Sequence, residues 1–328
     1  MVDEILPNIY KIEIPLRGNP LRVLNSYLIK SKERNLIIDT GLNREECLNK
    51  MLSSLKLLGV ELNRTDFFIT HLHVDHVGLV GNLVSSTSTK VYFNKPEAGI
   101  INSMSSVERW QRLGEIYKSH GFDEGELKEV MKGHPAYLYL RGLRRPIDFS
   151  ILKDSDTLDI GEYSLRCIAT PGHSPGHMCL YEINKQTLFS GDHILSEITP
   201  NISFWLEMEN SLDLYLASLK KIYPLDIKLV LPGHRSILTD HRKRITELEE
   251  HHQSRLKEAL SALKDGGRTA FQIAPHLTWD LDYSSWEQFP PLQKWFAIGE
   301  TIAHLQYLEK KGILQTKDIQ KKTVFSLV

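Results

Sequence analysis

Cysteine is scarce in this sequence, which has only Cys47, Cys167 and Cys179 among 328 residues. They are too few and too widely spaced for a disulfide framework or a cysteine-rich zinc site. None of them has a neighbouring histidine or basic cluster that would argue for a nucleophilic thiol. We therefore expect three small buried side chains in a reducing compartment, and the cytoplasm is the expected location.

The sequence also lacks a long apolar run and a surplus of charge. No stretch of about 18 apolar residues appears, and the N-terminal MVDEILPNIYKIEI carries acidic residues where a secretory signal carries basic ones. The formal net charge is -1, from 40 lysines and arginines against 41 aspartates and glutamates. Composition therefore indicates an ordinary globular protein and gives no argument for a membrane or a nucleic-acid partner.

β-rich segments form two sets along the chain. The first set comprises five expected strands, at residues 8–14, 23–29, 35–39, 66–70 and 90–93. A helix that ends at Gly59 is expected at 43–59. The second set comprises five further strands, at residues 156–160, 163–169, 177–183, 186–190 and 227–231. A helix is expected at 211–222, and the pattern suggests two similar βα halves.

An insertion, residues 97–150, separates the two sets. Its large apolar and aromatic residues include Met104, Val107, Trp110, Leu113, Tyr117, Tyr137 and Tyr139. Those between 107 and 117 recur at helical spacing, which predicts an amphipathic helix. The insertion either roofs an apolar pocket or forms a homodimer contact, and the sequence does not separate these two roles.

A second region, residues 242–328, changes to helical patterns. Helices are expected at 242–267, ending in a glycine pair, and at 290–312, before a terminal hairpin. The region holds 13 lysines and arginines against 11 aspartates and glutamates, a surplus of two, which is short of the basic patch that nucleic-acid contact requires. We expect a separate domain that packs as a lid over the preceding β-rich region. Its tryptophans are expected to reach that region or a pocket wall: Trp279, Trp286 and Trp295.

The segment THLHVDHVG, residues 70–78, concentrates polar chemistry directly after an apolar strand. His71 and His73 are two residues apart, so they point the same way in an extended segment. Asp75 and His76 are adjacent and precede a helical pattern, so they reach a neighbouring point rather than the same one. The four side chains therefore predict two metal centres that need further ligands from elsewhere.

Three later segments supply such ligands. His173 stands in TPGHSPGH, Asp192 in LFSGD and His234 in LVLPGH, each where a strand ends in a loop. Neutral imidazole and carboxylate suit zinc best, with iron or manganese as alternatives. An isolated histidine-rich loop is often a surface or buried cluster without an ion, but that interpretation leaves the three later segments unexplained.

With LIIDTG, THLHVDH, TPGHSPGH, SGD and LPGH in this order, residues 8–240 resemble the metallo-β-lactamase-fold hydrolases, the group of glyoxalase II and ribonuclease Z. The resemblance implies an α+β fold: an αββα sandwich in a catalytic domain at 1–241, with the helical insertion at about 97–150. The region 242–328 resembles the small C-terminal winged-helix-like domain of LACTB2-type proteins, some of which cut RNA.

The resemblance also implies the roles of the candidate residues. One divalent ion would be bound by His71, His73 and His173, a second by Asp75, His76 and His234, and both by a bridging Asp192. Asp39 of LIIDTG would hold the histidine loop in place. Asp75 and Asp192 would be the catalytic residues. The remaining histidines considered are expected to hydrogen-bond behind the ligands or to be structural (His177 and His193), or to be surface or packing residues (His134, His251, His252 and His304).

The chemistry that this site implies is hydrolysis by a metal-bound hydroxide, because two cations lower the pKa of a shared water from 15.7 towards about 7. The expected substrate is a small-molecule ester, thioester or lactone. Alternatives are an endoribonuclease acting on single-stranded RNA, a mononuclear iron oxygenase, and a binding protein whose metal site has lost turnover. The insertion and the C-terminal region are expected to wall the site together.

Overall fold

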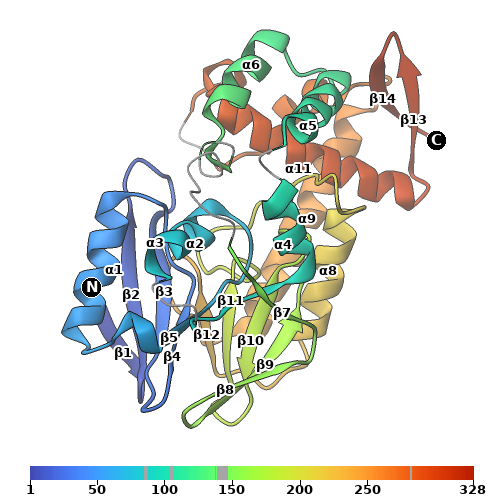
Figure 1. Cartoon of the computed structure of the whole chain (residues 1–328). Helices are drawn as coiled ribbons and strands as arrows, with labels where there is room; N and C mark the ends of the chain where they lie inside the picture. The colour runs from blue at the N-terminus through green and yellow to red at the C-terminus, as the bar shows by residue number, and fades with distance from the viewer. Residues whose placement is uncertain (85–87, 104–105, 137, 139–146, 281–282) are drawn as a thin grey trace.

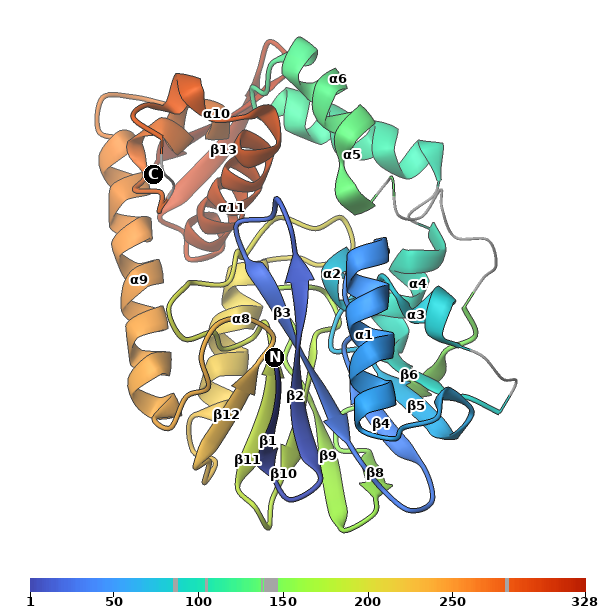
Figure 2. The ribbon, with the colours of Figure 1, turned by 90° about the vertical axis from the view of Figure 1, so that its left-hand side faces the viewer.

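The computed structural model describes residues 1–84, 88–103, 106–136, 138, 147–280 and 283–328. Two β-sheets pack face to face with helices on their outer sides, and a helical unit lies against one end of this sandwich (Figures 1 and 2). This αββα arrangement confirms the predicted α+β fold class. Among the described residues, none of the helices combines the length and the apolar character needed to span a bilayer.

The first sheet has, within the described chain, seven strands that lie in the order of the sequence. They are β1 (Val2–Leu6), β2 (Ile9–Leu16), β3 (Arg22–Ile29), β4 (Asn35–Ile38), β5 (Thr65–Phe68), β6 (Val91–Asn94) and β7 (Ser150–Leu152). Strands β1 to β4 pair antiparallel, whereas β4 to β7 pair parallel. Both β4 and β5 are buried throughout, and apolar residues follow one another in each, at 36–38 and 67–68, as expected of a strand covered on both faces.

The sequence pattern predicts neither edge strand of this sheet. β1 contains Asp3 and Glu4, charged residues that an edge strand tolerates because one side of it faces solvent. β7 has only three residues, too few for a period-two pattern to emerge. The inner strands were all predicted, because burial imposes the apolar pattern on them.

The second sheet consists, among the residues described, of five strands in the order β12-β11-β10-β9-β8. They are β8 (Thr157–Ile160), β9 (Tyr163–Ala169), β10 (Met178–Glu182), β11 (Thr187–Gly191) and β12 (Leu229–Pro232). Only the β11–β12 pair is parallel among the four pairings of this sheet in the described chain. The helix α8 (Ser211–Ile222) connects these two strands and has the predicted bounds.

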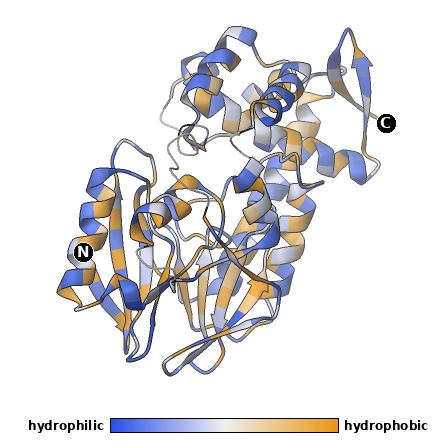
Figure 3. Cartoon of the chain, viewed as in Figure 1, coloured by the Kyte–Doolittle hydropathy of each residue, from blue (hydrophilic) through white to orange (hydrophobic). Residues whose placement is uncertain are grey.

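The two sheets share an apolar core, and hydrophobic residues concentrate on their strands (Figure 3). Tyr27 of β3 and Phe189 of β11 meet edge to face across the interface, with ring centroids 5.5 Å apart. Cys167 is buried in this core. All three cysteines are buried and free, as predicted.

Helices cover the outer face of each sheet. The helix α1 (Glu45–Leu57) packs on β2, where Ile12 and Ile14 are buried. The chain leaves α1 through Gly59 at a φ of +63°, close to the predicted end. On the second sheet, α8 buries Leu212 and Leu219 in the same core cluster as Val230 of β12. Short helices α2 (Val74–Val77) and α3 (Val80–Leu83) follow β5.

The predicted insertion contains three described helices, α4 (Lys95–Ser103), α5 (Val107–Ser119) and α6 (Glu124–Gly133). On α5, the predicted apolar face holds for Trp110, Leu113 and Tyr117, which are buried. Val107 is 64% exposed instead, because it is the first residue of α5. The expected contributions of Met104, Tyr137 and Tyr139 fall outside the described residues.

The C-terminal region contains helices and a small sheet. Its elements are α9 (His241–Ala262), α10 (Ala270–Ile273), α11 (Pro291–Lys310) and the hairpin of β13 (Leu314–Ile319) and β14 (Lys322–Leu327). Turns of 3-10 helix lie at Leu62–Arg64, Ala274–His276 and Trp286–Gln288. The helix α9 runs from beside the second sheet to this unit (Figure 2).

α9 ends before the glycine pair at which the sequence predicts its end. Arg268 and Phe325 exchange two backbone hydrogen bonds of 2.9 Å, so the chain must turn before it reaches Arg268. The apolar face predicted for α11 is buried as expected.

The three tryptophans of this region do not share the predicted role. Trp295 reaches the insertion, where it stacks on Tyr117 with ring centroids 3.5 Å apart. Trp279 packs against Arg255 and Trp286 against Phe289, both within the C-terminal region. The spacing of large aromatic residues in the sequence does not distinguish these two environments.

Candidate metal centre

All seven candidate ligands lie at one end of the sandwich, in the segments that follow four strands. His71 and His73 follow β5, Asp75 and His76 belong to α2, His173 follows β9, Asp192 follows β11, and His234 follows β12. Their ligand atoms form two groups, each with all atoms within 4.8 Å of one another: His71, His73, His173 and Asp192 in the first, and Asp75, His76 and His234 in the second. The structure thus brings together residues that the sequence holds far apart.

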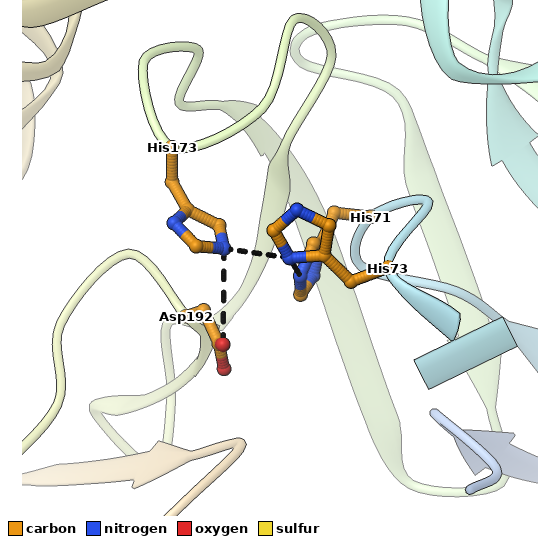
Figure 4. A group of neighbouring side chains, drawn as sticks. All are labelled: His71, His73, His173 and Asp192. Carbon is orange, nitrogen blue, oxygen red and sulfur yellow. Dashed lines mark hydrogen bonds and ion pairs between the residues drawn. The ribbon is translucent and has the colours of Figure 1, made fainter. Parts of the chain in front are cut away.

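The first group combines three imidazoles with one carboxylate (Figure 4). Nδ1 of His73 lies 2.9 Å from Nε2 of His71 and 3.0 Å from Nε2 of His173. Nε2 of His173 lies 3.8 Å from Oδ2 of Asp192. Three ring nitrogens and an oxygen that converge on one point form the donor set of a tetrahedral zinc site.

The second group lies next to the first, and Asp192 stands between them. Its Oδ1 lies 3.4 Å from Nε2 of His76, and its Oδ2 lies 3.6 Å from Nε2 of His234. Nε2 of His234 also lies 3.4 Å from Oδ2 of Asp75. Because one carboxylate reaches both groups, Asp192 is placed where a ligand shared by two ions would be.

Several of these donor atoms have no hydrogen-bond partner. In the described part of the chain, Nε2 of His76, Nε2 of His234 and Oδ1 of Asp192 are buried without one. A buried polar atom without a partner costs free energy, so such atoms are rarely left in a folded protein. A cation between the imidazole and carboxylate donors would satisfy all three atoms, and the residues present therefore fit divalent metal ions.

The second nitrogen of four imidazoles is held by an acceptor. Nδ1 of His173 donates to the carbonyl oxygen of Asn201 at 2.9 Å, and Nδ1 of His234 donates to that of Val23 at 2.7 Å. A carbonyl can only accept, so these rings carry the proton on Nδ1 and leave the Nε2 lone pair for an ion. Asp39 holds Nδ1 of His76 directly, and it holds Nδ1 of His71 through the hydroxyl of Thr70.

Asp39 organises the histidine loop, as the family resemblance implies. Its Oδ2 accepts from Nδ1 of His76 at 2.7 Å and from the hydroxyl of Thr70 at 2.8 Å, and its Oδ1 accepts from the Thr70 amide at 2.8 Å. The Thr70 hydroxyl can then accept from Nδ1 of His71, 3.0 Å away. One carboxylate therefore fixes an imidazole of each group.

Burial and neighbouring charges set the protonation of the ligands. Burial holds the pKa of His71 well below its usual range and lowers that of His73 to about 3, which keeps both imidazoles neutral. Burial also opposes the charge of His76, but Asp192 and Asp39 outweigh it and raise the pKa of His76. Burial raises the pKa of Asp192, and the charges of His234 and His76 more than reverse this, so it stays ionised.

Two features fix the orientation of Asp192. His177, considered as a residue behind the ligands, accepts the Asp192 amide through Nε2 at 3.1 Å and contacts the Thr170 hydroxyl through Nδ1 at 2.8 Å. Gly233 lets the carboxylate approach the backbone, because a Cβ there would lie 2.6 Å from Oδ1 of Asp192. The glycine of the LPGH segment therefore makes room for the shared ligand.

Glu97 is a buried carboxylate that sequence analysis missed. It belongs to α4 and accepts the Leu72 amide through Oε2 at 2.7 Å. Its Oε1 accepts the Ser174 hydroxyl at 2.7 Å and the Gly176 amide at 2.6 Å. Burial raises the pKa of Glu97 to about 7 against these three donors. Glu97 thus ties the loop of His71 and His73 to the loop of His173.

A second missed residue is Trp205, in the segment between β11 and α8. Its ring stacks on His73 with centroids 5.9 Å apart and planes at 24°. Its Nε1 donates to the carbonyl oxygen of His173 at 3.2 Å. A partly buried indole therefore adjoins two ligands of the first group.

The other histidines lie away from the two groups. His193 is buried and contacts Tyr215, with ring centroids 5.3 Å apart, and His134 packs against Trp110. His252 and His304 are buried, and Nδ1 of His252 lies 3.1 Å from Nε2 of His304. Their contacts are structural, which is one of the two roles that the sequence analysis gives for each of these residues.

His251, His252 and Glu300 also gather donor atoms within 4.8 Å of one another. Glu300 is already paired with Arg255, whose Nη1 lies 2.5 Å from Oε1. The guanidinium would repel a cation at this place. This cluster therefore carries a structural ion pair rather than a third metal site.

Comparison with known proteins agrees with this geometry. The family model described as Metallo-beta-lactamase superfamily matches residues 20–234. This range contains all seven candidate ligands as well as Asp39.

Individual relatives are distant in sequence but cover much of the chain. The chain is 25% identical over 301 residues to the "probable metallo-hydrolase YqjP" of Bacillus subtilis, covering 86% of each. It is 24% identical over 270 residues to an "atrochrysone carboxyl ACP thioesterase" of Aspergillus fumigatus, covering 80% of this chain. The match spans about two thirds of the length of such fungal relatives, 66% for one from Aspergillus niger and 67% for the thioesterase.

The fold also recurs in solved structures. A metallo-beta-lactamase family protein from Thermus thermophilus superposes with a TM-score of 0.82 at 26% identity. The superposition covers 99% of this chain and 100% of that one, so it includes the insertion and the C-terminal region.

Proposed function

Because the chain belongs to the metallo-beta-lactamase superfamily and gathers seven imidazole and carboxylate donors in two adjoining groups, we propose that it is a hydrolase that uses two divalent metal ions. Zinc is the proposed metal, since the donors are imidazoles and carboxylates. The proposed substrate is a small-molecule ester, thioester or lactone.

One observation carries the binuclear proposal: the carboxylate of Asp192 reaches both groups. Its Oδ2 lies 3.8 Å from Nε2 of His173 in the first group and 3.6 Å from Nε2 of His234 in the second, and its Oδ1 lies 3.4 Å from Nε2 of His76 in the second. A single ion in the first group would leave the gathered donors of Asp75, His76 and His234 without a cation. The unpartnered Nε2 atoms of His76 and His234 likewise support an ion in the second group.

When bound, two such ions would lower the pKa of a shared water and polarise the oxygen of the bond under attack, so the protein needs no side-chain nucleophile. The protein's own residues position the reactants. Burial opposes the ionised form of Asp75, but the adjoining His234 and His76 outweigh it and lower the pKa of Asp75 to about 2. Asp75 is therefore ionised at neutral pH and can accept a hydrogen bond from the attacking water.

The surroundings of the site support an acyl substrate. Trp205 places an apolar ring beside His73, and such a ring can pack against the acyl chain or ring of a substrate. The relative named as a thioesterase supports the same substrate class. The C-terminal region adds a surplus of only two positive charges, from 13 basic and 11 acidic residues, which gives RNA little to bind.

A substrate panel tests this proposal directly. The zinc-loaded protein should be assayed against acyl thioesters, lactones, carboxylic esters, phosphodiesters and single-stranded RNA. We expect turnover of at least one acyl substrate and none of RNA. Cleavage of RNA without turnover of any acyl substrate would replace the proposed activity by a nuclease activity.

Metal removal provides a prediction that does not depend on the substrate. The purified, zinc-loaded protein should contain about two ions per chain, and chelation should lower its melting temperature by several degrees. Each ion that binds only the folded state stabilises it by about 2.7 kcal/mol at a free concentration of 100 Kd. Elemental analysis and thermal unfolding measure both quantities, and restored zinc should restore the melting temperature. A single ion after full loading, with Asp75 and His234 unoccupied, would contradict the binuclear site.

A further inference from the structure

The segment 199–206 lies between the metal centre and the C-terminal helix α11. On one side, the carbonyl oxygen of Asn201 accepts the Nδ1 proton of His173 at 2.9 Å. Trp205 of the same segment donates to the carbonyl oxygen of His173 at 3.2 Å and stacks on His73. The orientation of His173 therefore depends on where this segment is held.

The side chain of Asn201 points to the other side and joins α11. Its Nδ2 donates to Oε2 of Glu300 at 2.6 Å. The other oxygen of Glu300 pairs with Nη1 of Arg255 on α9 at 2.5 Å, and Nη2 of Arg255 donates to the carbonyl oxygen of Thr278 at 2.5 Å. A continuous series of hydrogen bonds thus connects His173 to two helices of the C-terminal region.

Both charged members of this series are buried. Glu300 is 4% exposed and Arg255 is 6% exposed. A buried ion pair adds little net stability, because the loss of hydration offsets much of the attraction. The pair does hold a carboxylate oxygen at a fixed place, and Asn201 uses that oxygen.

A second contact fixes the same segment to α11. The Phe204 amide donates to the carbonyl oxygen of Gly299 at 3.0 Å. A Cβ at position 299 would lie 2.2 Å from Oγ of Ser203 and 2.5 Å from the hydroxyl oxygen of Tyr117. Glycine is therefore required for the close approach of the segment, α5 and α11 at this point.

We propose that Asn201 and Glu300 are positioning residues for His173, so that α11 forms part of the metal centre. The inference rests on the proposed function in one respect, that His173 binds an ion. Residues behind a histidine ligand fix its tautomer and its ring orientation, and their loss lowers metal affinity about 10-fold to 100-fold. Here Asn201 comes from the segment between β11 and α8, and Glu300 comes from the C-terminal region instead of from the sandwich.

Asn201→Ala is the central test, because it removes the link and leaves the buried pair of Glu300 and Arg255 intact. Chelator competition with zinc should show affinity for the first ion lowered about 10-fold or more. Affinity for the ion at Asp75, His76 and His234 should remain within about twofold, because no contact of that group depends on Asn201. Cobalt substitution, followed by absorption spectroscopy, separates the two sites.

A matched control is Glu126→Gln. Glu126 of α6 pairs with Lys294 of α11 at 2.5 Å, so this variant also removes an ion pair of α11, but one that does not reach segment 199–206. We expect unchanged affinity for both ions. An equal loss in this control would mean that loosening α11 in general, and not the Asn201 link, weakens the site.

A double variant separates positioning from general stability. Glu300→Gln alone should lower both the melting temperature and the affinity for the first ion, because it leaves Arg255 without its partner. When Glu300→Gln is combined with Asn201→Ala, it should still lower the melting temperature. It should cause no further loss of affinity for the first ion, since the hydrogen bond between Asn201 and Glu300 is already absent. A further loss of similar size would overturn the proposed series of contacts.

The metal-free protein gives an independent measurement. Nitrogen-15 NMR of the histidine rings should show His173 protonated at Nδ1 in the wild type and a mixture of tautomers in Asn201→Ala. Wild-type tautomer and wild-type zinc affinity in Asn201→Ala would refute the positioning role, even if the enzyme hydrolyses acyl substrates. A wild-type protein that binds zinc but hydrolyses nothing would instead refute the proposed activity and leave the positioning role supported.

Discussion

Asp192→Asn should remove most of the bound metal and lower hydrolysis at saturating zinc by about a thousandfold or more, which corresponds to about 4 kcal/mol of transition-state stabilisation. The amide keeps the size of the carboxylate but carries no negative charge. Two dications would then face each other with less compensation, and the shared donor would be a weak ligand. Because Asp192 contacts both groups, we expect both occupancies to fall.

His234→Ala is the matched comparison, because it removes a neutral donor from the second group alone. We expect one ion to be retained in the first group, as elemental analysis and chelator competition can measure. Kinetics on the acyl substrate identified by the panel gives the loss of activity in each variant. Near-normal turnover with two ions bound in Asp192→Asn would show that Asp192 is not shared, and the assignment of all seven ligands would then have to be revised.

Glu97→Ala should lower the free energy of unfolding by about 3 kcal/mol or more and weaken the first ion. The variant leaves the amides of Leu72 and Gly176 and the hydroxyl of Ser174 without their common acceptor. A buried donor without a partner costs about 1–3 kcal/mol. The loop of His71 and His73 and the loop of His173 also lose the group that joins them. Urea unfolding of the metal-free protein measures the stability, and zinc titration measures the affinity.

Glu97→Gln refines this test. An amide has only one acceptor oxygen, so its NH2 group must face at least one of the three donors, and we expect a smaller loss of the same kind. Glu182 provides a control, because it is also buried but accepts from Lys185 and Asn184 at the far end of β10. Glu182→Gln should lower stability and leave zinc affinity unchanged. Wild-type zinc affinity in both Glu97 variants would exclude a role of Glu97 in the metal centre.

The candidate ligands could be located from the sequence because each stands in a short motif. Every one of these motifs follows an apolar segment that becomes a buried strand, and the ligand comes at the point where the strand ends. Asp39, just after β4, was assigned only through the family resemblance of LIIDTG. Local patterns of this kind can be recognised in a single sequence.

The residues that hold these motifs together could not be located in this way. Glu97 meets Ser174, and Asn201 meets Glu300, across long separations in the chain. No sequence periodicity connects residues that are so far apart in the chain. A single acidic residue in a helix is also expected to be exposed to solvent. Only the three-dimensional packing of α4 and α11 reveals that Glu97 and Glu300 are buried beside the site.

The strand order of the two sheets has a consequence for the synthesis of the protein on the ribosome. Strands β1 to β7 lie in the order in which they are made, so each can pair with its predecessor as it emerges. The loop of His71 to His76 can therefore form early, whereas His173, Asp192 and His234 emerge with the second sheet. An ion that binds only the complete set thus joins the two halves late, after most of the nascent chain has folded.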